Sequence, residues 1–394
     1  MTIEKTWLDD TTLRVMTHRS GAFTFQLGLD SSTLQPLIDR INDAQLRFNK
    51  TPALPAIIDQ MQEKVTASSI YSTNTIEGGT YTEQQTEQIL QQDPATLQRS
   101  EERRLSNLKA AIDWIRQQPT TELVLGHNTE ITVQTCRQLH RLVSVNIDEK
   151  NNPSGHFRDN QKDQKTIVSN AEHGGTYRPP KCLADIEALM DAWAEWLNQP
   201  QIMAQSPLVR ASLAHYYFEL IHPFWDGNGR TGRLLEMLLL EQSGYRFSSA
   251  AIWVYYQQNI HEYFALFNQC RKLADKKQEG ANQPFVSFFQ KGMLATINDL
   301  HDQSSFFISI LLLKTMLSQA RMTKTISERQ FLLVETLTQL QLADHTIADL
   351  FREARVKLLY HTVTERTFYR DIKKLIEVGF LIETDNKLKI QLVR

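Results

Sequence analysis

A glycine-rich stretch, HPFWDGNGRTGR, runs from His222 to Arg233 and combines residue types that bind anions and move protons. At its centre, Gly227, Asn228 and Gly229 allow successive backbone N–H groups to turn inward around an anion. Its glycines also spell G-x-G-x-x-G, but a dinucleotide-binding turn needs a strand immediately before it. The preceding residues, ASLAHYYFELI, are instead typical of a helix. The stretch therefore predicts a phosphate site at the start of a helix, whose dipole favours an anion.

The charged side chains of this stretch fit a polyphosphate and a proton acceptor. Arg230 and Arg233 stand three positions apart, so both can face one site from one side of a helix. Two guanidinium groups and a backbone nest exceed what a single phosphate needs, and we therefore infer a polyphosphate. Asp226 supplies the hard oxygen that Mg²⁺ prefers beside phosphates. His222 can accept a proton near neutral pH.

The stretch resembles the motif of the Fic (filamentation induced by cAMP) family, H-x-F-x-[D/E]-G-N-G-R-x-x-R. All eight fixed positions are filled, by His222, Phe224, Asp226, Gly227, Asn228, Gly229, Arg230 and Arg233. The resemblance implies a mainly α fold, a Fic-type helical bundle with a small β-hairpin flap. It also implies an enzyme, a protein adenylyltransferase that moves AMP from ATP to a Ser, Thr or Tyr hydroxyl of a target protein or of itself.

The resemblance also implies a role for each motif residue. His222 would take the proton from the incoming hydroxyl, and Asp226 would hold Mg²⁺ against the α- and β-phosphates. The other phosphate contacts would come from Asn228 with the backbone amides of Gly227 and Gly229 at the α-phosphoryl oxygens, from Arg230 at the β-phosphate and from Arg233 at the γ-phosphate.

Three further features resemble flanking parts of Fic proteins. Asn259 and Tyr263 resemble the pair of the adenine pocket, although an ordinary polar-faced helix explains their spacing as well. Gly155 and Arg158 match a G-x-x-R that precedes the flap of the family. The hairpin expected at Lys165–Arg178 resembles that flap, which would align the target by adding its backbone as a strand.

An inhibitory signature of the same family, [S/T]-x-x-x-E-[G/N], is filled in STNTIEGG by Thr73, Glu77 and Gly78. If Glu77 pairs with Arg233, its carboxylate occupies the place that the γ-phosphate needs. The resemblance thus implies autoinhibition from the chain's own N-terminal segment. In some family members the same glutamate positions water to remove AMP, so a de-AMPylase or a bifunctional enzyme stays open.

The C-terminal segment TERTFYRDIKKLIEVGFLIETDNKLKIQLV has the pattern of a winged helix-turn-helix domain. An apolar stripe predicts a helix, and on its opposite face lie Arg366, Arg370, Lys373 and Lys374. Two strands joined by a tight Asp-Asn turn would form the wing. From Arg321 onward, thirteen Lys and Arg against ten Asp and Glu leave a charge of only +3. DNA binding and protein docking both remain open, as does a nucleotide-sensing DNA-binding regulator in place of an enzyme.

Four regions are therefore expected along the chain. Residues 1–95 form an N-terminal helical region that carries the inhibitory segment Thr73–Gly78, and residues 96–300 form the catalytic core. Residues 301–325 form a linker helix, and residues 326–394 form the winged-helix domain. Because relatives in the family often pair, we also expect a homodimer, with ATP and an unidentified target protein as the other partners.

The composition of the chain excludes several classes of protein. Its 43 Lys and Arg nearly balance its 45 Asp and Glu, so no global field points to a nucleic-acid coat or a membrane surface. Three widely spaced cysteines indicate reduced thiols rather than a disulfide scaffold. The longest apolar run, Phe306 to Leu313, is too short to cross a bilayer, and no signal peptide is apparent. We therefore expect a cytoplasmic protein without a membrane partner.

Overall fold

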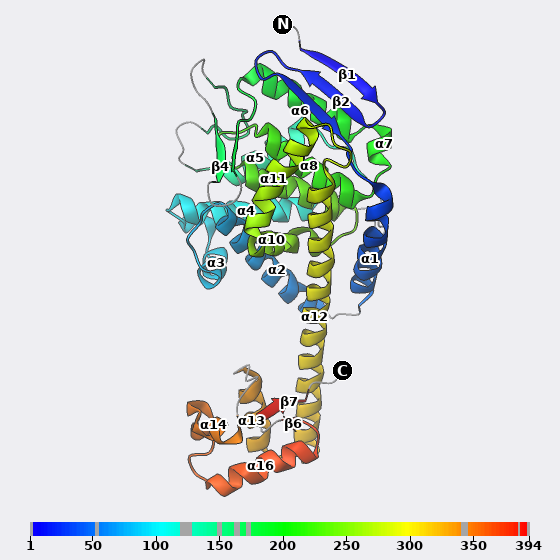
Figure 1. The fold of residues 1–394 in the computed structure, drawn as a ribbon. Coiled ribbons are helices and arrows are strands. Elements are labelled where there is room, and N and C mark those ends of the chain that lie inside the picture. The colour runs from blue at the N-terminus through cyan, green and yellow to red at the C-terminus, as the bar shows by residue number, and fades with distance from the viewer. Residues whose placement is uncertain are drawn as a thin grey trace. The chain divides into compact units, whose positions relative to one another are not determined.

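The computed structural model describes residues 3–51, 55–118, 128–147, 152–160, 166–170, 175–339, 346–384 and 387–391. It is mainly helical and divides into two compact units (Figure 1). The larger unit comprises residues 1–52 and 58–301, and the smaller one comprises residues 53–57 and 302–394. The expected N-terminal region therefore belongs to the same unit as the expected catalytic core.

Two consecutive helices, α8 (Pro207–Ile221) and α9 (Asn228–Gln242), pack against each other at the centre of the larger unit. Nearly all their side chains are buried, as expected for helices that are apolar on most faces. Pro207 occupies the first turn of α8, where its missing N–H costs no hydrogen bond. The Fic-like motif is therefore the connection between two core helices, together with the first turns of the second one.

Other helices of the larger unit surround this pair. Four helices that pack against it are α4 (Ser100–Arg116), α5 (Val133–Ser144), α6 (Leu183–Leu197) and α10 (Ser248–Gln258). Further helical elements are α1 (Ser31–Lys50), α2 (Pro55–Ile76), α3 (Glu83–Leu90), the short 3₁₀ turn Pro94–Thr96, α7 (Pro200–Met203) and α11 (Ile260–Asp275). Helix α3 begins with a capping box, in which Thr82 and Gln85 bond reciprocally to each other's backbone.

The N-terminal region is not purely helical, and that expectation was wrong. Three strands form an antiparallel sheet in chain order: β1 (Glu4–Asp9), β2 (Thr12–Met16) and β3 (Ala22–Gln26). On β2, Leu13 and Val15 are buried, and Phe25 of β3 stacks on Trp196 at 6.0 Å between ring centroids. The sheet is easily missed in the sequence because all six residues of β1 are exposed and the alternation on its neighbours is short.

The expected flap is present as two short strands. β4 (Val168–Asn170) pairs antiparallel with β5 (Gly175–Tyr177), with Val168 opposite Tyr177. The ends of the predicted hairpin are thus in register. Its turn, residues 171–174, and its first predicted residue, Lys165, lie outside the described residues.

The smaller unit contains the elements of the predicted C-terminal domain. The end of the long helix α12 (Gln283–Met322) is followed by α13 (Glu328–Gln339), α14 (Ile347–Arg352), α15 (Ala354–Leu359), α16 (Glu365–Glu377), β6 (Leu381–Thr384) and β7 (Lys387–Ile390). Their apolar core includes Leu317, Phe331, Phe368 and Leu388. The expected linker helix is the last part of α12, whose Leu317 belongs to this core. The Asp-Asn turn of the predicted wing, residues 385 and 386, lies outside the described residues.

Within the part of the chain that the structure describes, no helix combines the length and the hydropathy needed to cross a membrane.

Candidate functional site

Two left-handed residues shape the turn between α8 and α9. His222 ends α8 with φ 49°, and its N–H donates to the carbonyl of Phe218 at 2.9 Å. Gly227 starts α9 with φ 81°. A left-handed histidine is uncommon, and packing must hold it in place. The turn thereby sets the imidazole at the end of one helix, next to the exposed N–H groups that begin the next.

The amide of Asn228 closes this turn from inside. Its Oδ1 accepts a hydrogen bond from the Phe224 N–H at 2.9 Å, and its Nδ2 donates to the Phe224 carbonyl at 2.8 Å. Both ends of the amide are therefore engaged with backbone of the turn. The observed contact of Asn228 holds the loop, and its predicted contact with phosphate stays a prediction.

His140, which no sequence motif marks, supports the turn. Its ring stacks on Phe224 at 3.6 Å between centroids, with the planes 4° apart. Its Nδ1 accepts from the Gly155 N–H at 2.9 Å, so Nε2 carries the hydrogen and donates to the Asp226 carbonyl at 3.0 Å. Burial lowers the pKa of His140 to about 4, which keeps the ring neutral. In the sequence it is one histidine on an amphipathic helix, without a motif to mark it.

The residues of the G-x-x-R segment reach the same turn from another side. Arg158 Nε donates to the carbonyl of His222 at 2.7 Å, and Nη2 donates to the carbonyl of Pro180 at 2.7 Å. A third nitrogen of this guanidinium bonds to Asn160. Gly155 supplies the N–H that fixes the tautomer of His140. Arg158 is fully buried and stabilises the loop through these hydrogen bonds.

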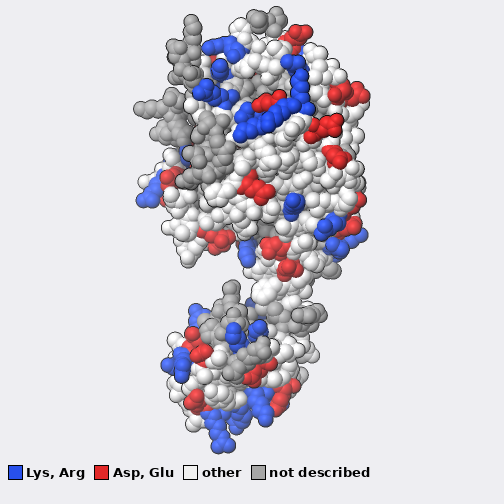
Figure 2. Space-filling model, viewed as in Figure 1, with Lys and Arg blue, Asp and Glu red and all other residues white. Residues whose placement is uncertain are grey.

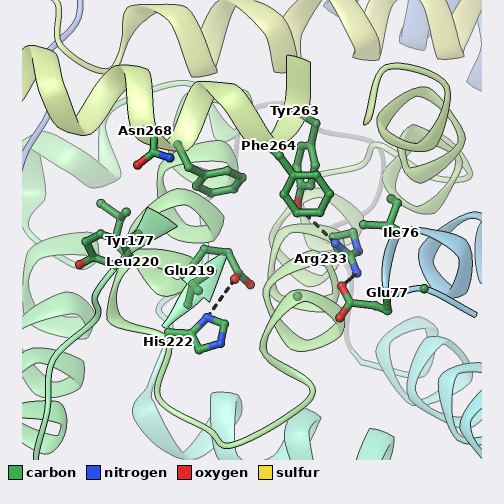
Figure 3. A pocket seen from close by; sticks show the side chains of 14 residues that line it. Ile76, Glu77, Tyr177, Glu219, Leu220, His222, Arg233, Tyr263, Phe264 and Asn268 are labelled. Atoms are coloured by element: carbon green, nitrogen blue, oxygen red, sulfur yellow. Dashed lines mark hydrogen bonds and ion pairs between the residues drawn. The ribbon is translucent and has the colours of Figure 1, made fainter. Parts of the chain in front are cut away.

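The inhibitory segment meets the motif at Arg233. Glu77, which directly follows α2, accepts from Arg233 Nη2 at 2.5 Å through Oε1 (Figure 3). Thr73 Oγ1 accepts from Nε at 2.7 Å, and Nη1 donates to the hydroxyl of Tyr263 at 3.3 Å. The Arg233 side chain is only 1% exposed, and Glu77 retains 27% exposure. The predicted pair therefore exists, and three partners hold its guanidinium.

The same carboxylate lies against the start of α9. A Cβ atom built on Gly229 would come within 2.2 Å of Glu77 Oε1. Glu77 therefore occupies the position in front of the helix N-terminus where an anion is favoured. Gly78, with φ 83°, turns the chain away after this contact. A glycine at position 229 is required for this close approach.

Asp226 and Arg230 form a pair of their own. Arg230 Nη2 lies 2.7 Å from Asp226 Oδ2, and Arg104 Nη2 lies 3.5 Å from the same oxygen. Burial opposes ionisation, but the charge and hydrogen bond of Arg230 lower the pKa of Asp226. The carboxylate is thus ionised and 38% exposed, which fits a Mg²⁺ ligand beside phosphates. Among the described residues no group of three or more His, Cys, Asp or Glu could hold a metal by itself.

A cavity of about 420 Å³ opens beside the turn (Figure 3). Its lining includes Glu77, Tyr177, His222, Gly229 and Arg233. His222, the start of α9, Glu77 and the strand β5 therefore surround one space. Its volume is typical of a cleft that takes a ligand of nucleotide size.

Comparisons with known proteins assign the central part of the chain. Residues 130–240 match the model of the Fic/DOC family. Over 262 residues, 66% of the chain and 46% of the relative, the chain is 32% identical to a protein of Drosophila ananassae named protein adenylyltransferase Fic. A protein of Culex quinquefasciatus with the same name is 29% identical over 64% of this chain and 45% of its own length. The chain thus spans less than half of these relatives.

A solved structure shares the fold over a longer part of the chain. A Fic family protein from Desulfovibrio desulfuricans G20 matches with a TM-score of 0.53 at 16% identity. The match covers 91% of this chain and 95% of that one. At this identity the likeness concerns the fold alone.

The fold does not bring every predicted site residue to the cavity. Arg230 is engaged with Asp226 and is not a lining residue, so its contact with a β-phosphate stays a prediction. Tyr263 lines the cavity, but its hydroxyl bonds to Arg233 and to His215 Nε2 at 3.1 Å. Asn259 bonds to the carbonyl of Tyr255 at the start of α11 and does not line the cavity.

Residues of α11 that follow Asn259 line the cavity. The cavity wall on α11 is formed, besides Tyr263, by Phe264, Phe267 and Asn268 (Figure 3). Asn259 precedes α11 by one residue and does not line this cavity, so its predicted contact with adenine stays a prediction.

Proposed function

We propose that this chain is a protein adenylyltransferase that transfers AMP from ATP to a Ser, Thr or Tyr hydroxyl of a target protein or of itself. The observation that carries the proposal is the cavity, where His222 and Arg233 stand on opposite sides of the N-terminus of α9. The names of the insect relatives support this reaction class. A base, an anion site and a buried cation are the parts that such a transfer requires.

In this reaction the hydroxyl oxygen of the target forms a bond to the α-phosphorus of ATP, and the bond to pyrophosphate breaks. His222 takes the hydroxyl proton, the backbone N–H groups at the start of α9 stabilise charge on the α-phosphoryl oxygens, and Arg233 binds the γ-phosphate. Asp226 would hold Mg²⁺, which neutralises phosphate charge when it is bound. The flap strand β5 would pair with the backbone of the target.

Glu77 keeps this site inhibited in the proposal. Its carboxylate binds Arg233 and lies against the N-terminus of α9 at Gly229, the two features that would otherwise bind the γ-phosphate. The alternative, removal of AMP by water that Glu77 positions, uses the same cavity. Incubation of a pre-modified target with Mg²⁺ alone separates the two, because only the alternative releases AMP in the absence of ATP.

ATP labelled at the α-phosphate tests the proposed reaction against its neighbours. The Glu77→Gly variant should acquire the α-label and the mass of one AMP, and should acquire no label from the γ-phosphate. Transfer of the γ-label instead would identify a phosphotransferase and refute the proposal.

For the smaller unit we propose a winged-helix domain that binds duplex DNA. Helix α16 carries four exposed cations on one face: Arg366, Arg370, Lys373 and Lys374. Among the described residues none of them has an ion-pair partner. Figure 2 shows Lys and Arg gathered along the edge where Figure 1 draws α16. Salt-dependent binding of the full chain to duplex DNA, weakened by Arg370→Ala, would support the proposal. Binding that Arg370→Ala leaves unchanged would refute it.

We further propose a homodimer and a cytoplasmic location. The stretch of α12 from Phe306 to Met316 exposes several large apolar side chains, among them Leu311 and Leu312, which favours pairing with a second copy. All three cysteines are buried and free, as suits a reducing compartment. Sedimentation of the full chain as a monomer at micromolar concentration would contradict the dimer.

A further inference from the structure

A second carboxylate, Glu219, faces the proposed base from the preceding turn of α8. Its Oε2 lies 3.5 Å from Nδ1 of His222 (Figure 3). The other ring nitrogen of His222 is turned away from Glu219 in the same view. The side chains of Glu219 and His222 are 14% and 19% exposed, and both line the cavity. The family motif begins at His222, so Glu219 lies outside it.

The surroundings of Glu219 keep its carboxylate charged. Burial raises the pKa of a carboxyl group, but the contact with His222, whose Nδ1 has no other partner among the described residues, and the charges of His215 and Arg233 together lower the pKa of Glu219. His215 has its own acidic partner, Glu236, at 2.9 Å from Nδ1. Glu219 therefore carries a negative charge next to the ring of His222.

The facing helix leaves room for this carboxylate at a variable position of the motif. A Cβ atom built on Gly232 would lie 2.7 Å from Glu219 Oε1 and 2.9 Å from the ring of His215. Any side chain at position 232 would thus push Glu219 away from where it meets His222. Glycine in the middle of a buried helix costs stability relative to alanine, so its presence fits a packing requirement.

We propose that Glu219 is a positioning residue that holds His222 in the Nδ1–H tautomer, so that Nε2 presents its lone pair to the target hydroxyl. The inference rests on the proposed adenylyl transfer. When the oxygen of that hydroxyl bonds to the α-phosphorus and pyrophosphate leaves, its proton passes to Nε2. The resulting imidazolium lies beside the Glu219 carboxylate, which stabilises its charge. This division of work between a base and an orienting carboxylate is the general logic of nucleophile activation.

The tautomer can be measured without any activity. In ¹⁵N-histidine spectra of the wild-type chain, the signal that His222→Ala removes should show a protonated Nδ1 and an unprotonated Nε2 when the ring is neutral. In Glu219→Gln the two tautomers should mix. A wild-type His222 found mainly as the Nε2–H tautomer would overturn the proposal, whether or not the chain transfers AMP.

Kinetics in the Glu77→Gly background then separate positioning from a merely structural role. Glu219→Gln should lower kcat about 10–100-fold, less than the about 10²–10⁴-fold loss expected for a missing base, with KM for ATP nearly unchanged. Glu187, an exposed glutamate on α6, gives the matched control Glu187→Gln, which should keep full activity. A Glu219→Gln variant with unchanged kcat would refute the inference. If Glu77→Gly itself transfers no AMP, the proposed function fails while the tautomer still decides the role of Glu219.

A double-mutant cycle tests the part that Gly232 plays. Gly232→Ala should reduce kcat to a similar extent as Glu219→Ala. In the Glu219→Ala background the same change should have little further effect, because the carboxylate that it displaces is absent. Equal losses in both backgrounds would show that Gly232 acts independently of Glu219 and would contradict the proposed packing.

Discussion

Replacement of Glu77 by glycine removes one of the three partners of Arg233 and is the most direct perturbation of the site. The bond between Glu77 Oε1 and Arg233 Nη2 is 2.5 Å long, on a guanidinium that is 1% exposed. A charge-assisted hydrogen bond shielded in this way contributes about 1.5–3 kcal/mol. Thr73 and Tyr263 still bind the same guanidinium in the variant, so Arg233 stays in position for a phosphate.

This free energy converts directly into nucleotide affinity. If the γ-phosphate must displace Glu77, the Glu77→Gly substitution should lower the Kd for ATP with Mg²⁺ by about 10–150-fold, because each factor of ten corresponds to 1.4 kcal/mol. Isothermal titration calorimetry measures the affinity, and α-labelled ATP measures automodification. Labelling should rise in Glu77→Gly and disappear when His222→Ala is added, while ATP binding persists.

Matched variants separate the charge from the backbone. Glu77→Gln keeps the length of the side chain and should fall between wild type and Glu77→Gly, because an amide can still bond to Arg233 without a charge. An ATP affinity and a low labelling level that are equal in all three proteins would refute the inhibitory role of Glu77.

Three further predictions follow from individual contacts. The pKa of His140 is about 4 in the folded chain and about 6.5 in the unfolded chain. The contribution of its neutral ring to the free energy of unfolding is therefore complete above pH 6.5 and is lost as the pH falls toward 4. Urea unfolding at pH 5 should therefore give about 2 kcal/mol less stability than at pH 7, and His140→Gln should reduce that difference. Tyr263→Phe removes one hydrogen bond to Arg233 and should weaken ATP binding about 3–10-fold in the Glu77→Gly background, measured by calorimetry; an unchanged Kd would argue against this contact in the bound state. Asp371 is buried and accepts hydrogen bonds from Arg329 at 2.8 Å and from two other side chains. Asp371→Ala should lower the free energy of unfolding of the smaller unit by about 3 kcal/mol, measured as a lower Tm of that unit, while AMP transfer is retained.

The motif could be predicted because its chemistry is local. From His222 to Arg233 the glycines, the acid and the cations follow one another along a turn and the first part of a helix. Their relative positions depend on backbone conformations that the residue types themselves favour, as the left-handed Gly227 illustrates. The partnership of Glu77 with Arg233 was also predicted, but from a resemblance, since the two are separated by 156 positions.

Tertiary packing decided the contacts that join distant segments. The ring of His140 beneath the turn, the hydroxyl of Tyr263 on Arg233, and the failure of Asn259 to reach the cavity depend on how whole helices rotate against α8 and α9. Helical periodicity indicates which face is buried, but it leaves open which neighbour that face meets. The N-terminal sheet was missed for a related reason, because its edge strand is exposed throughout. Residue order along the chain thus determined the reacting groups, and only packing between helices determined the partners that hold them in place.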